Sequence, residues 1–275
     1  MTWRNLLSAT LALCAVAMAS LQTTAQASGA MAPVPKECET PGTAAIAGSP
    51  LPNVATALKE RRKITILAIG GTSASLRGPV SGGEYARVKT FLEATFKGVD
   101  VDIVHRGVSG ELAQGAAERI KTEVALNSAD LVLWQLGTAD ALAHVPVDDF
   151  RETVTQAVQW LKDHEVDVIL VGMRYARSMA KHEHYQAIRA AVRDIAKAQN
   201  VIRISRYEAE ETMARIRREE GRPASESELS EATYVCMAEH LARAIAAGLF
   251  LKPGALGGGR DAPAPVPPAA LPKQQ

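Results

Sequence analysis

The sequence has no excess of charge of either sign. Its 275 residues include 31 basic and 30 acidic side chains, which gives a formal net charge of +1. Proteins that bind nucleic acids or anionic membrane surfaces through charge carry a clustered basic excess. The composition therefore excludes an electrostatic basis for such binding, and we expect no nucleic-acid partner.

Long hydrophobic runs are also missing, apart from one near the amino terminus. Leu6–Ala19 is uncharged and apolar, follows the single positive charge of Arg4, and precedes the A-x-A pattern of Ala25–Ala27. The run is shorter than the roughly 20 residues that a membrane span needs. This order is typical of a secretory signal peptide. We expect residues 1–27 to be removed, and the mature protein, without a membrane span, to be periplasmic or secreted.

Cysteine is scarce, with Cys14, Cys38 and Cys236 only. Cys14 lies in the predicted leader, where bulky Leu13 argues against a lipoprotein signal. Two cysteines then remain, and two cysteines in an oxidising compartment predict one disulfide. It would close a loop of roughly 200 residues, which the chain-entropy model values at up to ~5 kcal/mol. The alternative is a pair of free thiols.

Periodicity divides the mature chain into three parts. Residues 28–62 are rich in Ala, Pro, Gly and Thr at their start and show no repeat, which predicts an irregular lead-in. Residues 252–275 contain GGG and APAPVPP and predict a disordered tail. Residues 63–251 are left as one domain, the natural count for this length.

Five short apolar runs alternate with helical segments in that domain. One segment places Tyr185, Ile188, Val192 and Ile195 at helical spacing, and a final helix is expected from about residue 230 to 251. The alternation predicts a parallel sheet with helices on both faces. Ligands of such sheets bind beyond the carboxyl ends of the strands. The predicted strands are residues 64–69, 99–104, 131–136, 166–171 and 201–204.

A glycine-rich turn, Gly70–Ser73, follows the first predicted strand. Such turns often cradle phosphates, but this one lacks both G-x-G-x-x-G and G-K-[ST]. The turn therefore does not indicate a nucleotide site, and we expect no cofactor.

Six segments taken together resemble the conserved blocks of the SGNH (GDSL-type) hydrolases. Five of them follow in the family's order at the predicted strand ends, and the sixth lies at the start of the last helix, over roughly residues 63–251. The resemblance implies a flavodoxin-like three-layer α/β sandwich with strand order 2-1-3-4-5 and an ester- or acyl-hydrolase site. The segments are GGTS (70–73), HRGVSGE (105–111), WQLGTAD (134–140), VGMRYA (171–176), SRY (205–207) and LSEATYVC (229–236).

The resemblance also assigns the catalytic positions, and most of them are substituted. Thr72 stands at the serine nucleophile, Ala139 at the oxyanion asparagine, Ser225 at the triad aspartate and Glu228 at the triad histidine; only the oxyanion glycine, Gly107, is retained. Loss of one oxyanion donor costs ~10²–10³ in rate. Loss of a triad member leaves only ~10³–10⁴ over the uncatalysed reaction. The sequence therefore predicts no efficient esterase of the usual mechanism.

Other side chains are candidates for a role at the site. Ser73 is a displaced nucleophile, and His105 is a base at the end of the second strand. Asp140, Arg174 and Tyr175 are predicted to line the cleft, with Asp140 also suited to cap the helix after the third strand. No metal site is expected, because histidines two apart on a helix, such as those at 182 and 184, diverge.

Two hypotheses for function follow. In the first, the chain is a pseudoenzyme that binds a ligand or a protein partner in the remnant cleft. In the second, it is an ester or acyl hydrolase with a rearranged site that uses Thr72 or Ser73. A third possibility is a purely structural envelope protein. The ligand implied by the resemblance is a small molecule, either a carbohydrate or an acyl ester.

Overall fold

The computed structural model describes residues 38, 49–61, 63–71, 83–221 and 226–250, with side chains of the last stretch from residue 233. The predicted signal peptide and tail, and Thr72, Ser73 and Ser225, lie outside these residues, as does the side chain of Glu228. In chain order the elements are α1 (Pro52–Arg61), β1 (Lys63–Gly70), α2 (Gly83–Thr95), β2 (Asp100–Gly107), α3 (Ala113–Asn127), β3 (Leu131–Gln135), α4 (Thr138–Leu142), α5 (Val147–Asp163), β4 (Asp167–Val171), the 3-10 turn η4 (Arg177–Met179), α6 (Glu183–Ala198), β5 (Ile202–Ile204), α7 (Arg206–Glu219) and α8 (Glu226–Phe250).

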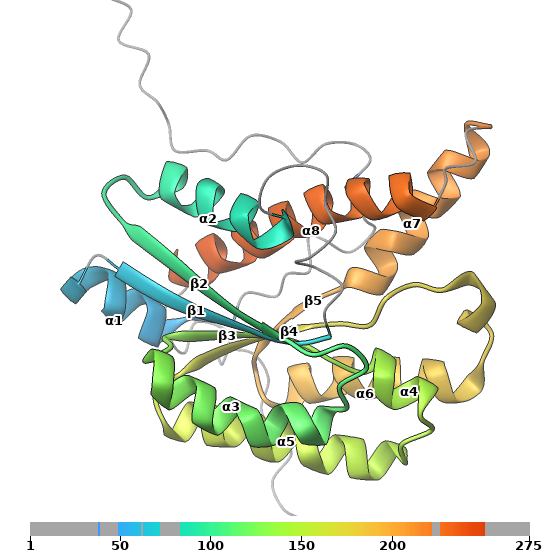
Figure 1. Ribbon diagram of the computed structural model, residues 1–275, viewed down its shortest axis with the longest axis horizontal. Helices are drawn as coiled ribbons and strands as arrows, with labels where there is room; N and C mark the ends of the chain where they lie inside the picture. Colours follow the sequence, from blue (N-terminus) through green and yellow to red (C-terminus); the bar gives the residue numbers. More distant parts are fainter. Residues whose placement is uncertain (1–37, 39–48, 62, 72–82, 222–225, 251–275) are drawn as a thin grey trace, which may run out of the picture. The chain divides into compact units, whose positions relative to one another are not determined.

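The five strands form one parallel sheet in the order β2-β1-β3-β4-β5. This order confirms the predicted flavodoxin-like fold class. Figure 1 shows the sheet between two layers of helices, with α2 and α8 on one side and α3, α5 and α6 on the other. All five predicted strands are present, with ends that differ by up to three residues.

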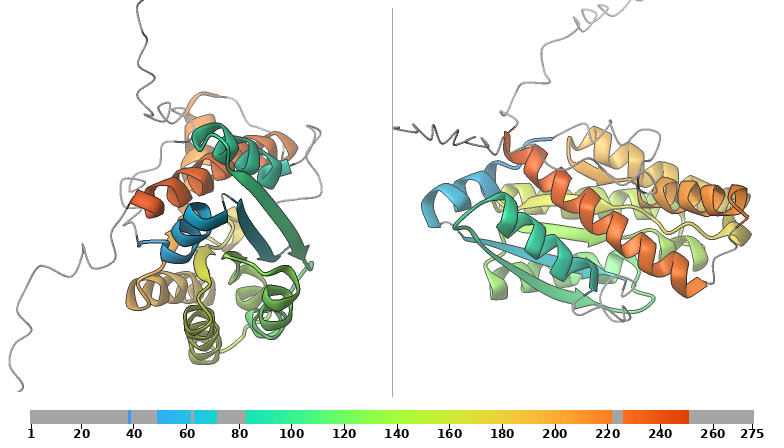
Figure 2. Two further views of the ribbon diagram at one scale, coloured as in Figure 1. Left: turned by 90° about the vertical axis from the view of Figure 1, so that its left-hand side faces the viewer. Right: turned by 90° about the horizontal axis from the view of Figure 1, so that it is seen from above.

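Side chains that alternate along the strands pack into two separate hydrophobic cores, one on each face of the sheet. Leu67, Val132 and Leu170 pack with α3, α5 and α6, whereas Ile66, Leu133 and Ile169 pack with α1, α2 and α8. Figure 2 shows α2 and α8 side by side over the second face. Because β3 and β4 are buried at every residue, they appear in the sequence as nearly continuous hydrophobic runs, whereas β2, at the edge of the sheet, is only partly buried.

The lead-in is not irregular throughout, because it contains helix α1. The prediction for residues 28–62 is wrong over Pro52–Arg61. The carboxylate of Asp167 accepts the N–H groups of Asn53 (3.0 Å) and Val54 (2.9 Å) at the start of this helix. Unpaired N–H groups at a helix start need such an acceptor. The acceptor lies more than 100 residues away in the sequence, and so no local pattern indicated it.

The predicted disulfide between Cys38 and Cys236 is confirmed. The two Cα atoms are 5.1 Å apart, and the residues are separated by 198 positions in the chain. Both cysteines are buried and pack with Met213 of α7. The bond therefore ties the amino-terminal part of the described chain to α8.

The carboxyl ends of the strands form a single row across the sheet. Gly70 of β1 pairs with Gly107 of β2 and with Gln135 of β3, and Val171 of β4 pairs with Gln135 and with Ile204 of β5. The five family-like segments that follow the strands therefore leave the sheet at one edge. This edge is where a ligand is expected in an open parallel sheet.

Gly70→Ala is expected to destabilise the protein by at least roughly 1–3 kcal/mol. Gly70 has φ +108°, and a Cβ there would lie 1.9 Å from the carbonyl oxygen of Gln135. The control is Gly71→Ala, where the nearest atom would be Gln135 Nε2 at an ordinary 3.8 Å. Urea denaturation of both variants measures the difference. Equal stabilities would show that the close approach of β1 to β3 is wrong.

Candidate functional site

The structure brings three of the predicted site residues to the carboxyl edge of the sheet. Gly107 is the last residue of β2, Ala139 lies in α4 directly after β3, and Arg174 follows β4. Thr72 comes two residues after Gly70, outside the described part of the chain. The described residues of the predicted site thus lie at one edge of the sheet, and their roles in a reaction stay a prediction.

Asp140 is buried and joins two of the loops at this edge. Its side chain accepts the N–H of Ala113 at the start of α3 (2.8 Å) and the N–H of Gly137 at the start of α4 (3.2 Å). Burial raises the pKa of Asp140, and these backbone hydrogen bonds oppose the rise. The carboxylate therefore caps α4, as predicted, and also α3. It holds the connection that follows Gly107 against the connection that contains Ala139.

A second contact orients the connection after β2. Arg119 of α3 donates from Nε and Nη2 to the two oxygens of Glu111, at 2.6 and 2.9 Å. The same Nη2 also donates to the carbonyl of Arg106, next to Gly107 (2.8 Å). A bidentate guanidinium–carboxylate pair is geometrically specific. These contacts therefore hold the connection after Gly107 against α3 and the end of β2.

Glu210 of α7 holds the chain after β4. Its Oε2 accepts the N–H of Tyr175 at 2.6 Å, and its Oε1 lies 3.4 Å from Arg174 Nε. The predicted cleft residues Arg174 and Tyr175 are both half-buried. They are therefore positioned by a helix that comes later in the chain.

A buried charged group lies beside this contact and was missed by the sequence interpretation. Arg206, which is 0% exposed, donates from Nε to Glu210 Oε1 at 2.9 Å, and its Nη2 lies 3.9 Å from Oε2 of buried Glu84. Burial raises the pKa of Glu84 to about 7, against the lowering effect of Arg206. The one available signal was the SRY segment after β5. Nothing in the sequence placed Glu84 of α2 next to it.

His105 lies on β2, two residues before Gly107, and its ring contacts the ring of Tyr85 with centroids 5.5 Å apart. Burial and the neighbouring Arg106 lower the pKa of His105. The imidazole is therefore neutral at neutral pH, the form that a general base requires.

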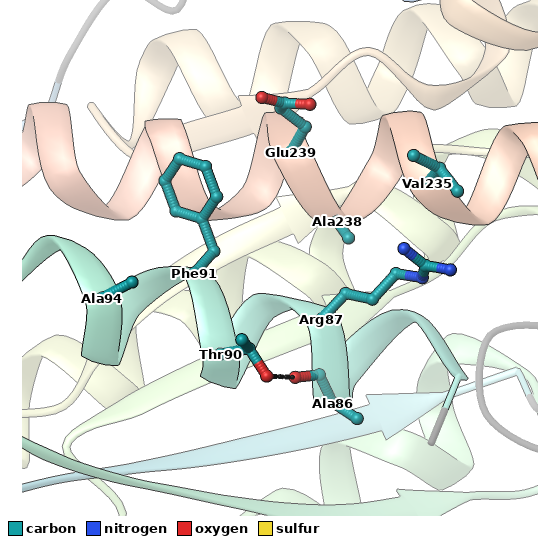
Figure 3. A pocket seen from close by; sticks show the side chains of 8 residues that line it. All are labelled: Ala86, Arg87, Thr90, Phe91, Ala94, Val235, Ala238 and Glu239. Carbon is teal, nitrogen blue, oxygen red and sulfur yellow. Dashed lines mark hydrogen bonds between the residues drawn. The ribbon is translucent and has the colours of Figure 1, made fainter. Parts of the chain in front are cut away.

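A groove lies between α2 and α8, away from the row of strand ends. It has a volume of about 530 Å³, and Figure 3 shows Arg87 and Phe91 of α2 pointing towards α8. None of its lining residues is a predicted site residue. They are Ala86, Arg87, Thr90, Phe91, Ala94, Val235, Ala238 and Glu239.

Within the described ranges, no three His, Cys, Asp or Glu side chains are grouped to hold a metal ion. No helix of the described chain is both long and apolar enough to cross a membrane.

Solved structures with a similar fold include proteins named as esterases and lipases. The catalytic mutant of an acetylxylan esterase from Geobacillus stearothermophilus is 18% identical, with a TM-score of 0.53 over 66% of this chain and 94% of that one. A lipase/acylhydrolase from Enterococcus faecalis is 21% identical, with a TM-score of 0.51 over 66% and 94%. A protein named as a GDSL-like lipase from Parabacteroides merdae is 14% identical, with a TM-score of 0.53 over 67% and 96%. At these identities the similarity shows the fold alone.

No similar sequence is found among curated proteins. The sequence model of the Non-GDSL lipase-like family matches residues 37–250, which is most of the chain. The resemblance to SGNH/GDSL-type hydrolases is thereby confirmed. This protein belongs to the Non-GDSL lipase-like family.

Proposed function

We propose that this chain is an exported, non-catalytic member of its family that binds a small-molecule ligand at the carboxyl edge of the sheet. The observation that carries the proposal is Ala139. It lies at the start of α4, its methyl side chain has no hydrogen-bond donor, and the family resemblance assigns it to the position of the oxyanion asparagine. An oxyanion donor contributes ~2.7–4 kcal/mol to the stabilisation of the transition state.

The connections on either side of Ala139 and Gly107 are held in place by buried or paired side chains. Asp140 fixes the turn that contains Ala139, and the Glu111–Arg119 pair fixes the turn that follows Gly107. A protein that keeps this framework but substitutes the groups of the reaction is suited to binding. The substitutions act together, because Thr72 lacks an imidazole partner if Glu228 stands at the triad histidine.

The ligand class is inferred from the family. An acetylxylan esterase and a lipase/acylhydrolase share the fold. We infer a carbohydrate or an acyl ester as the ligand, with a protein partner as an alternative. Export is inferred from the amino-terminal sequence and is supported by the disulfide.

The mature protein is expected to hydrolyse p-nitrophenyl acetate no faster than its Thr72→Ala variant. With Glu228 at the position that the resemblance assigns to the triad histidine, the threonine hydroxyl has no imidazole base there, stays protonated and is a poor nucleophile. Steady-state rates of both proteins provide the test. Wild-type turnover that disappears in Thr72→Ala would refute the proposal.

Further variants test whether another residue acts as the nucleophile or base, and whether activity returns when the substituted catalytic positions are reverted. Turnover that survives Thr72→Ala but is lost in Ser73→Ala or His105→Ala would reveal a rearranged hydrolase. The fourfold variant Thr72→Ser, Ala139→Asn, Ser225→Asp and Glu228→His restores every substituted position. Single reversions are expected to recover little, because triad residues act as a unit.

A further inference from the structure

The backbone at Arg174 is held from three helices. Its N–H donates to Thr138 Oγ1 of α4 (3.1 Å), and its carbonyl accepts the hydroxyl of Tyr185 of α6 (2.6 Å). The next N–H, that of Tyr175, donates to Glu210 of α7 (2.6 Å). The start of this side chain is therefore fixed before any ligand arrives, which lowers the entropy lost on binding.

The Nε atom of the Arg174 guanidinium faces the protein interior, and its two Nη groups form the other end. Nε is buried and lies 3.4 Å from Glu210 Oε1, whereas the side chain as a whole is 33% exposed. No described residue forms a hydrogen bond with its two Nη groups. A ligand would therefore meet the end of the guanidinium that Nη1 and Nη2 form.

The charges around Arg174 leave a positive excess. Glu210 Oε1 is shared between two guanidinium groups, at 2.9 Å from Arg206 Nε and 3.4 Å from Arg174 Nε. The other nearby carboxyl is that of Glu84, 3.9 Å from Arg206. Because burial raises the pKa of Glu84 to about 7, it supplies only part of a negative charge at neutral pH. With two guanidinium groups, one carboxylate and a partly ionised Glu84, the group keeps a net positive charge of less than one and can attract a further anionic group from outside.

We propose that Arg174 recognises the ligand of this protein, and that the ligand is a small molecule with one carboxylate group. A planar guanidinium fork matches the two oxygens of a carboxylate. A positive excess of less than one charge fits a carboxylate monoanion better than a phosphate dianion. The inference rests on the proposed function, in which this edge of the sheet binds a ligand.

Calorimetric titration at low ionic strength tests the proposal with matched pairs of probes. D-galacturonate is compared with neutral D-galactose, and octanoate with neutral octanol. We expect at least one acid to bind about tenfold or more tightly than its neutral partner, since hydrogen bonds to charged groups contribute about 1.5–3 kcal/mol. Tighter binding of galacturonate than of octanoate would identify the ligand as a sugar acid, and the reverse would identify it as an aliphatic acid. Equal binding of the two acids would show that the site recognises only the carboxylate group.

Variants assign the preference to Arg174. Arg174→Gln is expected to abolish it, and Arg174→Lys, which keeps the charge but not the fork, to reduce it. The matched control is Arg177→Gln, which removes the same charge from an exposed position in the same connection and should bind like wild type. Circular dichroism of each variant checks that it is folded.

Three results would overturn the proposal. They are equal binding of acids and neutral partners at millimolar concentrations, an equal loss in Arg177→Gln and Arg174→Gln, and tighter binding of methyl phosphate than of either carboxylate. None of these readouts involves ester hydrolysis. A wild-type protein that hydrolyses esters would therefore refute the non-catalytic function without deciding whether Arg174 binds a carboxylate.

Discussion

Removal of the Cys38–Cys236 disulfide is expected to lower the free energy of unfolding by about 2–5 kcal/mol. The bond closes a loop of 198 residues, and a long loop restricts the unfolded chain strongly. Both sulfur atoms also lie in a buried cluster with Met213. Urea denaturation of the Cys38→Ala, Cys236→Ala double variant measures the loss.

Reduction of the wild type provides the control for this experiment. Dithiothreitol should bring the wild-type stability down to that of the double variant and leave the variant unchanged. If the reductant destabilised both proteins equally, the effect would not come from this bond. A double variant as stable as the oxidised wild type would contradict the prediction.

Arg206→Met is expected to cost about 3–5 kcal/mol, the usual loss when one partner of a buried ion pair is removed. Arg206 is fully buried between Glu210, at 2.9 Å, and Glu84, at 3.9 Å. Methionine retains the length of the stem, so that most of the loss comes from the carboxylates left without their partner. Chemical denaturation near neutral pH measures it.

A second ion pair on the same helix supplies the matched control. Arg215 and Glu219 of α7 have the same spacing, at 3.6 Å, but their side chains are 53% and 63% exposed. Arg215→Met should cost no more than about 0.5 kcal/mol, because such helix pairs are screened by solvent. Similar losses at the two positions would show that burial does not decide the strength of the Arg206 contacts.

The pH dependence of the Arg206→Met loss has a defined sign. Arg206 lowers the pKa of Glu84, so its removal raises further a pKa that burial already holds at about 7, above the ordinary 4.5. Below this pKa the buried carboxyl binds a proton and no longer needs a cation. The loss should therefore be smaller near pH 5 than near pH 8. A loss that increased towards low pH would exclude Glu84 as its source.

The sequence by itself determined the sheet and the edge at which the site lies. Runs such as Leu131–Gln135 are buried on both faces, so their hydrophobicity is continuous and visible without any structure. Five of the segments that resemble the family's blocks could be located because they come directly after the predicted strands, and this order can be read from the sequence alone. The Cys38–Cys236 pair could be predicted because only two cysteines lie outside the predicted leader.

Only the tertiary structure decided how the side chains at that edge are supported. Asp167 caps α1, Asp140 caps α3, and Glu84 of α2 lies beside Arg206 of α7. Each of these contacts joins residues that are far apart in the chain, and the polar residues involved match surface residues in type and local spacing. These polar residues are buried because whole helices pack together. Burial raises the pKa of Glu84, so that the carboxylates only partly neutralise Arg174 and Arg206. Hydrophobic periodicity is a property of neighbouring residues. It therefore identified the fold and the carboxyl edge of the sheet, but not the buried charged group of Glu84, Arg206 and Glu210 beside that edge.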